Sequence, residues 1–141
     1  MALEYHPYVG TIVLCNYNTG FKLPEMVKKR PAVIISPRLR RRDGLCSVVP
    51  LSQTAPKEVQ EYHYELILER PLPKPWNSPS YWVKADMIST VGFHRLHLIG
   101  IGKDHEGKRK YLTSRIPDLD LINIKKCVLN ALGMTILTSH L

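Results

Sequence analysis

Positively charged side chains give this sequence its clearest chemical signal, because they are concentrated in one stretch. The 141 residues include 20 Lys and Arg and 12 Asp and Glu, a formal net charge of +8. Residues 20–57 carry nine basic and two acidic side chains, a balance of +7 that leaves +1 for the rest of the chain. Lys and Arg placed on phosphates release counterions, so a basic segment gains affinity for RNA or DNA. We therefore expect an anionic partner, with a purely solvated surface loop as the alternative.

Other side chains that often do chemistry are not arranged in a known pattern. The sequence has no G-x-S-x-G elbow and no glycine-rich phosphate-binding motif. His94 and His97 lie three residues apart without a third ligand nearby, so no metal site is predicted. Cys15, Cys46 and Cys127 are odd in number and form no C-x-x-C pair, which favours buried, reduced thiols. We predict no cofactor.

Several short motifs follow one another in a characteristic order. They are GTIV at 10–13, a loop containing Gly20 and Glu25, RPAVI at 30–34, VVPLS at 48–52, and DMISTV at 86–91 followed by Arg95 and Leu96. This ordered series resembles the PemK/MazF family of toxins from type II toxin-antitoxin systems. These are small ribosome-independent endoribonucleases built on an SH3-like barrel. The resemblance covers residues 8–54 and 82–133, and it implies the same fold and activity here.

The resemblance assigns two residues to the scissile phosphate. Arg30 matches the catalytic Arg that precedes the strand-opening proline. Its guanidinium is always protonated, so it would clamp the charge of the transition state and not donate a proton. Its alternative role is a surface ion pair with Glu25. Ser52 stands where many relatives have Thr, and its hydroxyl could donate to a phosphate oxygen or simply complete a turn.

Two carboxylates fall on family positions that could hold the general base. Glu25 lies in a loop five residues before Arg30, and Asp86 follows Lys84 in a basic-x-Asp pair, where one branch of the family has Arg in place of Lys. Either could take the proton from a ribose 2′-OH, and either could be a salt-bridge partner. The sequence does not choose between them.

The implied reaction is metal-independent cleavage of single-stranded RNA by attack of the 2′-OH on the adjacent phosphate. Flanking phosphates would be held by basic residues that set affinity and not base choice. The resemblance further implies a homodimer and a cognate antitoxin with an acidic segment. The rival interpretation is a non-catalytic SH3-like module, nucleic-acid-binding or similar to the CcdB toxins, since fold alone does not fix function. The expected RNA-binding residues are Lys28, Lys29, Arg40, Arg41, Arg42 and Lys84.

Hydrophobic patterning predicts the elements that must position these residues. Apolar, β-prone stretches recur at 10–17, 30–37, 45–51, 62–68 and 81–88, and a hairpin is expected from 96–101 and 110–113. The run 30–37 reads as a strand buried on both faces, paired antiparallel with 45–51. Four prolines in 70–80 predict an irregular excursion. Helical spacing after Pro117 predicts a closing helix at 118–132.

Together these patterns predict a mainly β single domain over residues 1–141, a small barrel or sandwich with a C-terminal helix, and the family resemblance implies that it is an SH3-like small β-barrel. No apolar run approaches the roughly 20 residues of a membrane-spanning helix. The N-terminus lacks the apolar stretch of a secretory signal, so we expect a cytoplasmic protein with no membrane partner.

Overall fold

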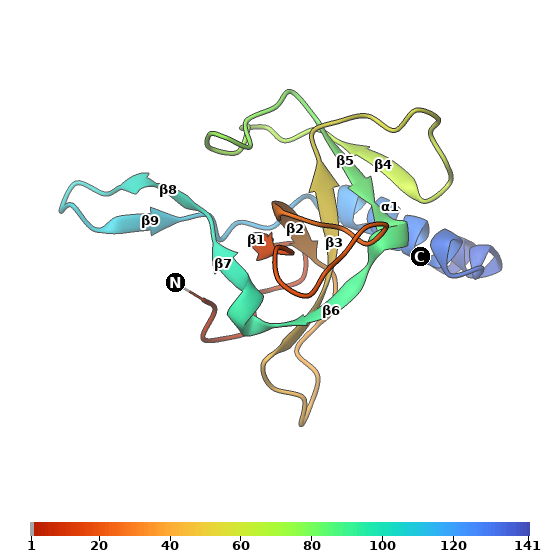
Figure 1. Cartoon of the computed structure of the whole chain (residues 1–141), viewed down its shortest axis with the longest axis horizontal. Coiled ribbons are helices and arrows are strands. Elements are labelled where there is room, and N and C mark those ends of the chain that lie inside the picture. Colours follow the sequence, from red (N-terminus) through yellow and green to blue (C-terminus); the bar gives the residue numbers. More distant parts are fainter. Residues whose placement is uncertain (1) are drawn as a thin grey trace.

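One antiparallel sheet organises the chain in the computed structural model, which describes residues 2–141. Its strand order is β4-β5-β3-β2-β1-β7, and β6 pairs with β3 outside this path (Figure 1). The strands are β1 (Ile12–Asn16), β2 (Lys29–Ile34), β3 (Leu45–Ser52), β4 (His63–Leu66), β5 (Tyr81–Lys84), β6 (Ser89–Gly92) and β7 (Leu96–Leu98). A separate two-stranded sheet joins β8 (Gly100–Lys103) to β9 (Arg109–Tyr111). The predicted mainly β architecture is confirmed.

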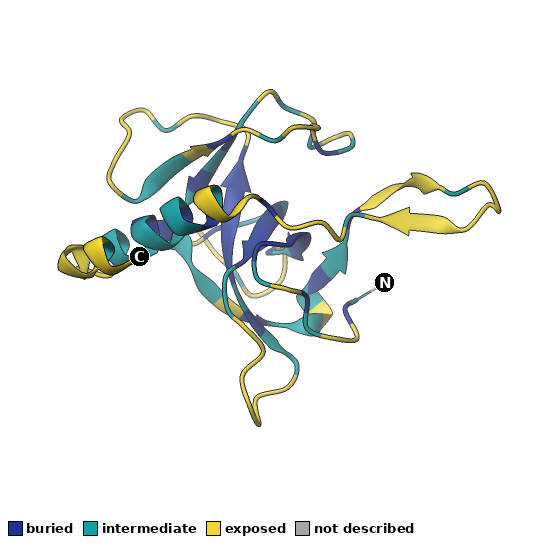
Figure 2. Cartoon of the chain, turned by 180° about the vertical axis from the view of Figure 1, so that it is seen from behind, coloured by how far each residue is buried: buried dark blue, intermediate teal, exposed yellow. Residues whose placement is uncertain are grey.

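Alternation along the central strands divides the core into two clusters, one on each face of the sheet. Ile12, Val33 and Val49 belong to the first cluster, while Val13 and Ala32 belong to the second. The helix α1 (Asp118–Ala131) covers the first cluster with Leu121, Ile124 and Cys127. Figure 2 shows this helix lying across the buried strands. The central strands are therefore apolar on both faces, as predicted for 30–37.

The opposite face is covered by the β1–β2 loop, residues 17–28. Tyr17 and Met26 are buried in the second cluster, and Phe21 packs against it. In Figure 1 the loop crosses in front of β2 and β3, and in Figure 2 the helix lies on the other side. The sheet thus has a helix-covered face and a loop-covered face.

The stretch predicted as a single strand at 81–88 is two strands joined by a 3-10 turn. The strand β5 ends at Lys84, the turn η1 spans Ala85–Met87, and β6 begins at Ser89. Both strands pair with β3, β5 near its end and β6 near its start, so the chain must turn between them. The other short turns are η2 (Phe93–Arg95) and η3 (Thr135–His140). The predicted helix and the irregular excursion at 70–80 are both present.

Two segments project from the body of the sheet. They are the β2–β3 loop, residues 35–44, and the hairpin formed by β8 and β9, which we call the β8–β9 arm, residues 100–111 (Figure 1). Both are largely exposed in Figure 2. The three cysteines are free and buried, and burial raises the pKa of Cys15 from its ordinary 9.0 to about 11. No helix within residues 2–141 is long and apolar enough to span a membrane.

Candidate active site

Arg30 and Ser52 emerge at the same end and on the same face of the sheet. Ala32 pairs with Pro50 in the antiparallel register of β2 and β3. The ladder between the two strands ends at this pair, and Arg30 and Ser52 each lie two residues beyond it, toward the same end of the sheet. The even-numbered residues of both strands face the loop-covered cluster, which includes Ala32 and Val48. Strand pairing therefore puts the two sequence-predicted residues at one end of the sheet and on one face.

The guanidinium of Arg30 is fixed at one nitrogen and open at the other two. Its Nε donates a hydrogen bond to the carbonyl oxygen of Val27 at 2.8 Å. Within residues 2–141, its two terminal amino groups make no hydrogen bond and no ion pair. The side chain is half-buried, which strengthens its field relative to a freely solvated charge. This is the arrangement required of a preorganised anion clamp, and the alternative ion pair with Glu25 is not formed.

Ser52 is more enclosed than Arg30. Its side chain is 4% exposed, and its hydroxyl donates to the carbonyl oxygen of Thr54 at 3.2 Å and accepts from the Thr54 amide at 3.1 Å. These bonds close the turn that follows β3. In this conformation Ser52 therefore holds the backbone beside Arg30 and presents no free donor to solvent.

Lys84 reaches the same face from the next strand. Trp82 pairs with Ser52 in the register of β3 and β5, and Lys84 follows two residues later on the same side of β5. It is half-buried. Asp86 is exposed on the η1 turn just beyond the end of β5. Of the two candidate bases, Asp86 is the one on an ordered turn next to the sheet.

Glu25 sits on the β1–β2 loop and bonds within it. Its Oε1 accepts from the Lys22 amide at 3.2 Å, while its own amide donates to the Lys22 carbonyl oxygen at 2.8 Å. No carboxylate of the described chain lies within 4.0 Å of Arg30. Glu25 therefore stabilises a loop turn in this conformation.

Beneath the loop, two hydroxyl groups are buried without partners. The hydroxyl oxygens of Tyr17 and Ser89 have no hydrogen bond within residues 2–141. Burial raises the pKa of Tyr17 far above its ordinary value, Cys15 beside it adds to the rise, and Ser89 and Arg30 oppose it. Tyr17 is therefore neutral and lies close enough to Arg30 to sense its charge. Sequence reasoning missed both hydroxyls, although Tyr17 directly follows β1 and continues the alternation of Val13 and Cys15.

The loop itself is pinned by Arg95. One of its terminal amino groups donates to the carbonyl oxygens of Asn16 at 3.1 Å and Thr19 at 2.7 Å. Its guanidinium also lies 4.8 Å from the centre of the Phe21 ring, a cation–π contact. At the base of the loop the Tyr17 amide donates to the Lys28 carbonyl oxygen at 2.9 Å. The loop is thus held closed over the Arg30 face.

Comparison with known proteins identifies the family. Residues 8–127 match the family described as PemK-like, MazF-like toxin of type II toxin-antitoxin system. The chain belongs to this family. An uncharacterized protein of Haemophilus influenzae is 26% identical over 145 residues, which cover 94% of this chain and 95% of that one.

Solved structures of the family share the fold. MazF from Deinococcus radiodurans superposes with a TM-score of 0.63 at 20% identity, covering 93% of this chain and 100% of that chain. An endoribonuclease from a mycobacterial species, crystallised with its cognate antitoxin, gives a TM-score of 0.58 at 21% identity over 92% and 97% of the two chains. The expected MazF-like fold, mainly β with a C-terminal helix, is therefore confirmed.

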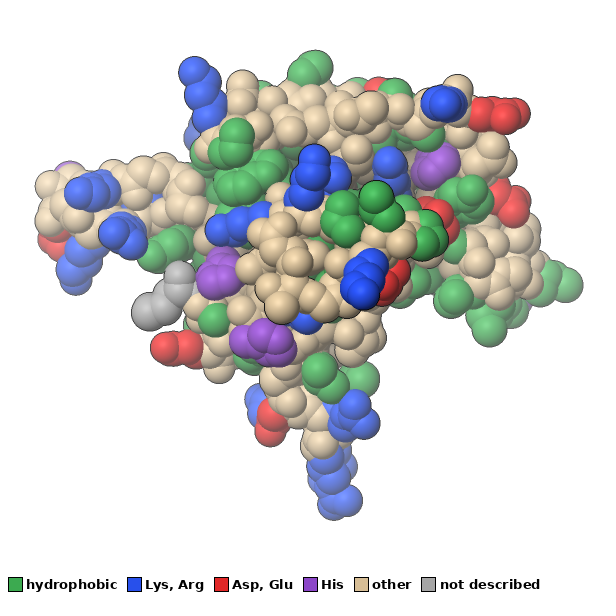
Figure 3. Space-filling model, viewed as in Figure 1, with side chains coloured by type: hydrophobic (Ala, Val, Ile, Leu, Met, Phe, Trp, Pro, Cys, Tyr) green, Lys and Arg blue, Asp and Glu red, His purple; other side chains and the backbone are tan. Residues whose placement is uncertain are grey.

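The predicted RNA-binding residues fall into two groups in this fold. Lys28 and Lys29 directly precede Arg30 and are exposed; Lys28 ends the β1–β2 loop, whereas Lys29 starts β2 and alternates to the face opposite Arg30 and Lys84. The arginines of the β2–β3 loop lie beyond Ile34, at the other end of β2, which is about 13 Å from Arg30 along the strand. Figure 3 shows Lys and Arg side chains on both projecting segments and across the loop-covered face between them. The distant group consists of Arg40, Arg41 and Arg42, all exposed.

Concave surfaces lie elsewhere on the molecule. One of about 850 Å³ is bounded by the excursion and the base of the β8–β9 arm, and one of about 440 Å³ lies on that arm. Neither is lined by Arg30 or Ser52. No cluster of three or more His, Cys, Asp or Glu side chains able to hold a metal ion occurs within residues 2–141.

Proposed function

We propose that this protein is an endoribonuclease toxin that cleaves single-stranded RNA by transphosphorylation. The 2′-OH of one ribose attacks the adjacent phosphorus, the bond to the 5′-oxygen of the next nucleotide breaks, and that oxygen takes up a proton. The products are a 2′,3′-cyclic phosphate and a 5′-OH end. RNA supplies its own nucleophile, so positioning and charge stabilisation are the tasks left to the protein.

The observation that carries this proposal is the state of Arg30. Its Nε is bonded to Val27, which orients the guanidinium plane, while both terminal amino groups remain free. A guanidinium with two free amino groups matches the paired equatorial oxygens of a phosphorane. Arg95 is also half-buried and bonded to backbone carbonyl oxygens, but it holds the β1–β2 loop, whereas Arg30 keeps both terminal amino groups free. Arg30 therefore stabilises the charge that develops in the transition state.

Ser52, Lys84 and the lysines before Arg30 support the same phosphate from the surroundings. Ser52 fixes the turn beside Arg30 through Thr54 and acts as a positioning residue unless those bonds exchange on RNA binding. Lys28, Lys29 and Lys84 hold neighbouring phosphates. Single-stranded RNA is favoured as substrate because its bases can splay and its backbone can adopt the in-line geometry.

The general base is Glu25 or Asp86. The two candidates differ in whether the protein must move before the carboxylate can reach the substrate. Glu25 reaches the substrate only if the β1–β2 loop moves, since it now caps a turn of that loop. Asp86 is exposed on an ordered turn and makes no hydrogen bond or ion pair within residues 2–141. Glu25→Gln and Asp86→Asn separate the two: the true base loses about 100-fold in cleavage rate and the acidic limb of the rate–pH profile.

The positive charge of the Arg30 face also suits an acidic partner protein. The mycobacterial endoribonuclease was crystallised with its cognate antitoxin. We propose that a cognate antitoxin binds this chain through an acidic segment laid along Lys28, Arg30 and Lys84, and that the toxin acts as a homodimer.

The deciding experiment incubates purified protein with an unstructured RNA in excess EDTA and maps the ends of the fragments. Wild-type protein is expected to give 2′,3′-cyclic phosphate and 5′-OH ends. Arg30→Ala is expected to cleave about 1,000-fold more slowly because one preorganised charge contact is removed. Lys126→Ala, on the helix α1 that covers the opposite face of the sheet, is the matched control and should cleave at the wild-type rate. Intact RNA with all three proteins would leave the non-catalytic binding module as the function.

A further inference from the structure

The β8–β9 arm combines positive charge with an exposed aromatic ring. Residues 100–111 carry the four basic side chains Lys103, Lys108, Arg109 and Lys110 and the two carboxylates Asp104 and Glu106. All of these twelve residues are exposed except Asp104, which is half-buried. The arm forms a sheet of its own and projects from the body in Figure 1. An isolated two-stranded hairpin gains little stability, so its retention calls for a role other than packing.

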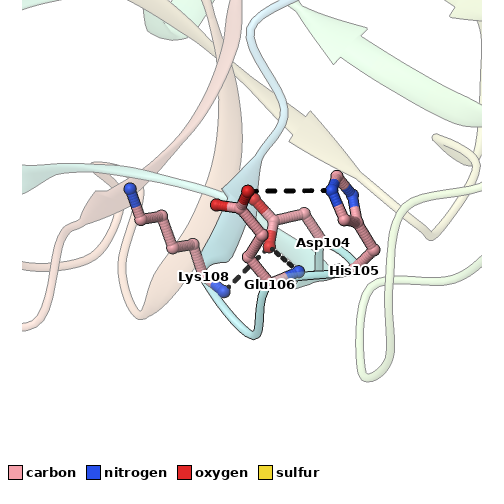
Figure 4. A network of polar contacts seen from close by, with 4 residues as sticks. All are labelled: Asp104, His105, Glu106 and Lys108. Carbon is pink, nitrogen blue, oxygen red and sulfur yellow. Dashed lines mark hydrogen bonds and ion pairs between the residues drawn. The ribbon is translucent and has the colours of Figure 1, made fainter.

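Both carboxylates of the arm are engaged at its tip (Figure 4). Oδ1 of Asp104 accepts hydrogen bonds from the amides of Glu106 and Lys108, each at 2.9 Å. Oε1 of Glu106 lies 3.8 Å from Nε2 of His105. No carboxylate within residues 2–141 comes within 4.0 Å of a Lys or Arg of the arm. The strands of the arm are therefore left with their positive charge unneutralised.

Two of these charges face each other directly. Lys103 pairs with Arg109 across the two strands. Like charges at directly opposed positions destabilise a strand pair, and a bound anion between them would remove the repulsion. The strand register therefore places two positive charges where a phosphate can bind between them, on a hairpin that pairs with no other strand.

An aromatic ring lies beside this charge pair with open space around it. Tyr111 follows Arg109 by two residues on the same strand face, and it pairs with Gly100. Because Gly100 and Gly102 carry no side chains, a concave surface of about 440 Å³ is left, lined by Gly100, Gly102, Lys103, Arg109, Lys110 and Tyr111. A Cβ built on Gly100 meets nothing within 4 Å. The Tyr111 ring is 38% exposed.

We propose that the β8–β9 arm is a binding site for single-stranded RNA, with a phosphate between Lys103 and Arg109 and a base stacked on Tyr111. Cationic side chains beside an exposed aromatic ring are what a nucleic-acid strand needs, whereas an acidic peptide needs only the charges. The inference rests on the proposed function, because the strand held here is the substrate of the Arg30 face. The arm leaves β7 after Leu98, which pairs with Val13, while Arg30 pairs with Cys15. Only RNA longer than the cleavage site itself reaches both.

The test measures RNA binding in the Arg30→Ala background, so that no cleavage intervenes, with a fluorescent oligouridylate of about 24 nucleotides and one of about 5. Lys103→Gln with Arg109→Gln should weaken binding of the long strand about tenfold and reduce the slope of log affinity against log salt by about 1.4, the value for two contacts to a single strand. Binding of the short strand should change less than about twofold. Lys125→Gln with Lys126→Gln removes two charges from the helix α1, on the side of the molecule away from the arm in Figures 1 and 2, and is the matched control.

A second variant tests the base-stacking surface without changing charge. Gly100→Leu fills the concave surface opposite Tyr111 at a position whose backbone accepts a side chain. It should weaken binding of the long strand about fivefold and leave the salt slope unchanged. An unchanged affinity with Gly100→Leu, or equal slope changes in the arm pair and the control pair, would overturn the proposal. So would an oligoglutamate that binds as tightly as RNA and loses affinity with the arm pair, since the occupant would then be an acidic protein segment.

These outcomes are separable from those of the cleavage experiment. RNA that is bound through the arm but never cleaved by the wild-type protein leaves the arm in place and removes the proposed function. RNA that is cleaved while the arm variants bind like the control keeps the function and removes the arm.

Discussion

The Arg30 face and the β8–β9 arm present positive charge in two different ways. Arg30 is half-buried, bonded to the Val27 carbonyl oxygen and covered by the β1–β2 loop. Lys103 and Arg109 stand on an exposed hairpin, and no carboxylate oxygen within residues 2–141 comes within 4.0 Å of their charged groups. A charge that must stabilise a transition state has to be fixed before the reaction, whereas a charge that holds a flexible strand has only to be within reach. The difference separates a candidate catalytic arginine from binding residues of the same charge.

The two regions also differ in how the fold accommodates unfavourable contacts. Near Arg30, the hydroxyls of Tyr17 and Ser89 are buried without partners. On the arm, two like charges oppose each other in register. Each arrangement reduces stability by an amount of order 1 kcal/mol. Each proposed contact with RNA therefore lies beside an arrangement that the fold alone does not favour.

The comparison is tested most severely by Arg30→Lys. Lysine keeps the charge but lacks the planar fork, so it cannot bond Val27 and present two further donors at once. We expect the single-turnover cleavage rate of bound RNA to fall about 100-fold while RNA affinity changes less than about threefold. Equal losses in rate and affinity would show that Arg30 is an anchor of the same kind as the arm residues. Rates at saturating protein and equilibrium binding measure the two quantities separately.

The closed loop over Arg30 is tested by Arg95→Ala. The substitution removes two hydrogen bonds from a charged donor to Asn16 and Thr19 and the contact with the Phe21 ring. We expect a loss of about 2 kcal/mol in the free energy of unfolding and faster hydrogen exchange at the Tyr17 amide. Arg38→Ala breaks an exposed ion pair with Asp43 at 3.3 Å and should cost less than about 0.5 kcal/mol. Similar losses from both variants would mean that Arg95 does not hold the loop.

The elements that the sequence predicts well are those whose cause is local. The runs at 30–37 and 45–51 are apolar and flanked by turn residues, so their pairing followed, and with it the placement of Arg30 and Ser52 at one end of the sheet. The break at Ala85 could not be foreseen. It arises because β3 pairs with both β5 and β6, and nothing in the residues near Ala85 announces a turn.

The environment of the site depended on contacts between distant segments. Burial of Ser52 and its bonds to Thr54, and the enclosure of Tyr17 beside Ser89, require the loop and β6 to be in place. A hairpin was expected from 96–101 and 110–113, but its charge was not singled out, because the chain outside residues 20–57 has a net charge of only +1. The structure commits both carboxylates of the arm to its tip and leaves its basic side chains without them. The net charge of a segment therefore underestimates the positive charge that a hairpin presents to a ligand.

A comparison of two buried tyrosines tests whether the Tyr17 hydroxyl, near Arg30, lacks a hydrogen-bond partner in the protein without RNA. Tyr81 and Tyr17 are both fully buried, but the Tyr81 hydroxyl donates to the Trp76 carbonyl oxygen at 2.5 Å and accepts from the Leu72 amide at 3.0 Å. Tyr81→Phe should lower the free energy of unfolding by about 1.5 kcal/mol because it leaves a buried amide unpaired. Tyr17→Phe removes a buried hydroxyl that makes no hydrogen bond within residues 2–141, and it should raise the free energy of unfolding by about 1 kcal/mol. Denaturant unfolding of both variants gives the comparison, and equal losses would show that Tyr17 has a partner in solution.

The smallest expected effect comes from a substitution on the β8–β9 arm, and it tests the contrast between the arm and the Arg30 face. Lys103→Glu turns the like-charge pair with Arg109 into an opposite-charge pair. At low salt we expect the hairpin to gain about 0.3 kcal/mol, measured as slower hydrogen exchange at the Asp104 amide, which donates to the Lys108 carbonyl oxygen at 2.8 Å. The same variant should bind long RNA more weakly, because it loses a phosphate contact and adds a repulsive charge. Stability and binding should therefore move in opposite directions, as they do when a residue is retained for its ligand and not for the fold. A variant that becomes both less protected and unchanged in RNA binding would show instead that Lys103 serves the hairpin itself.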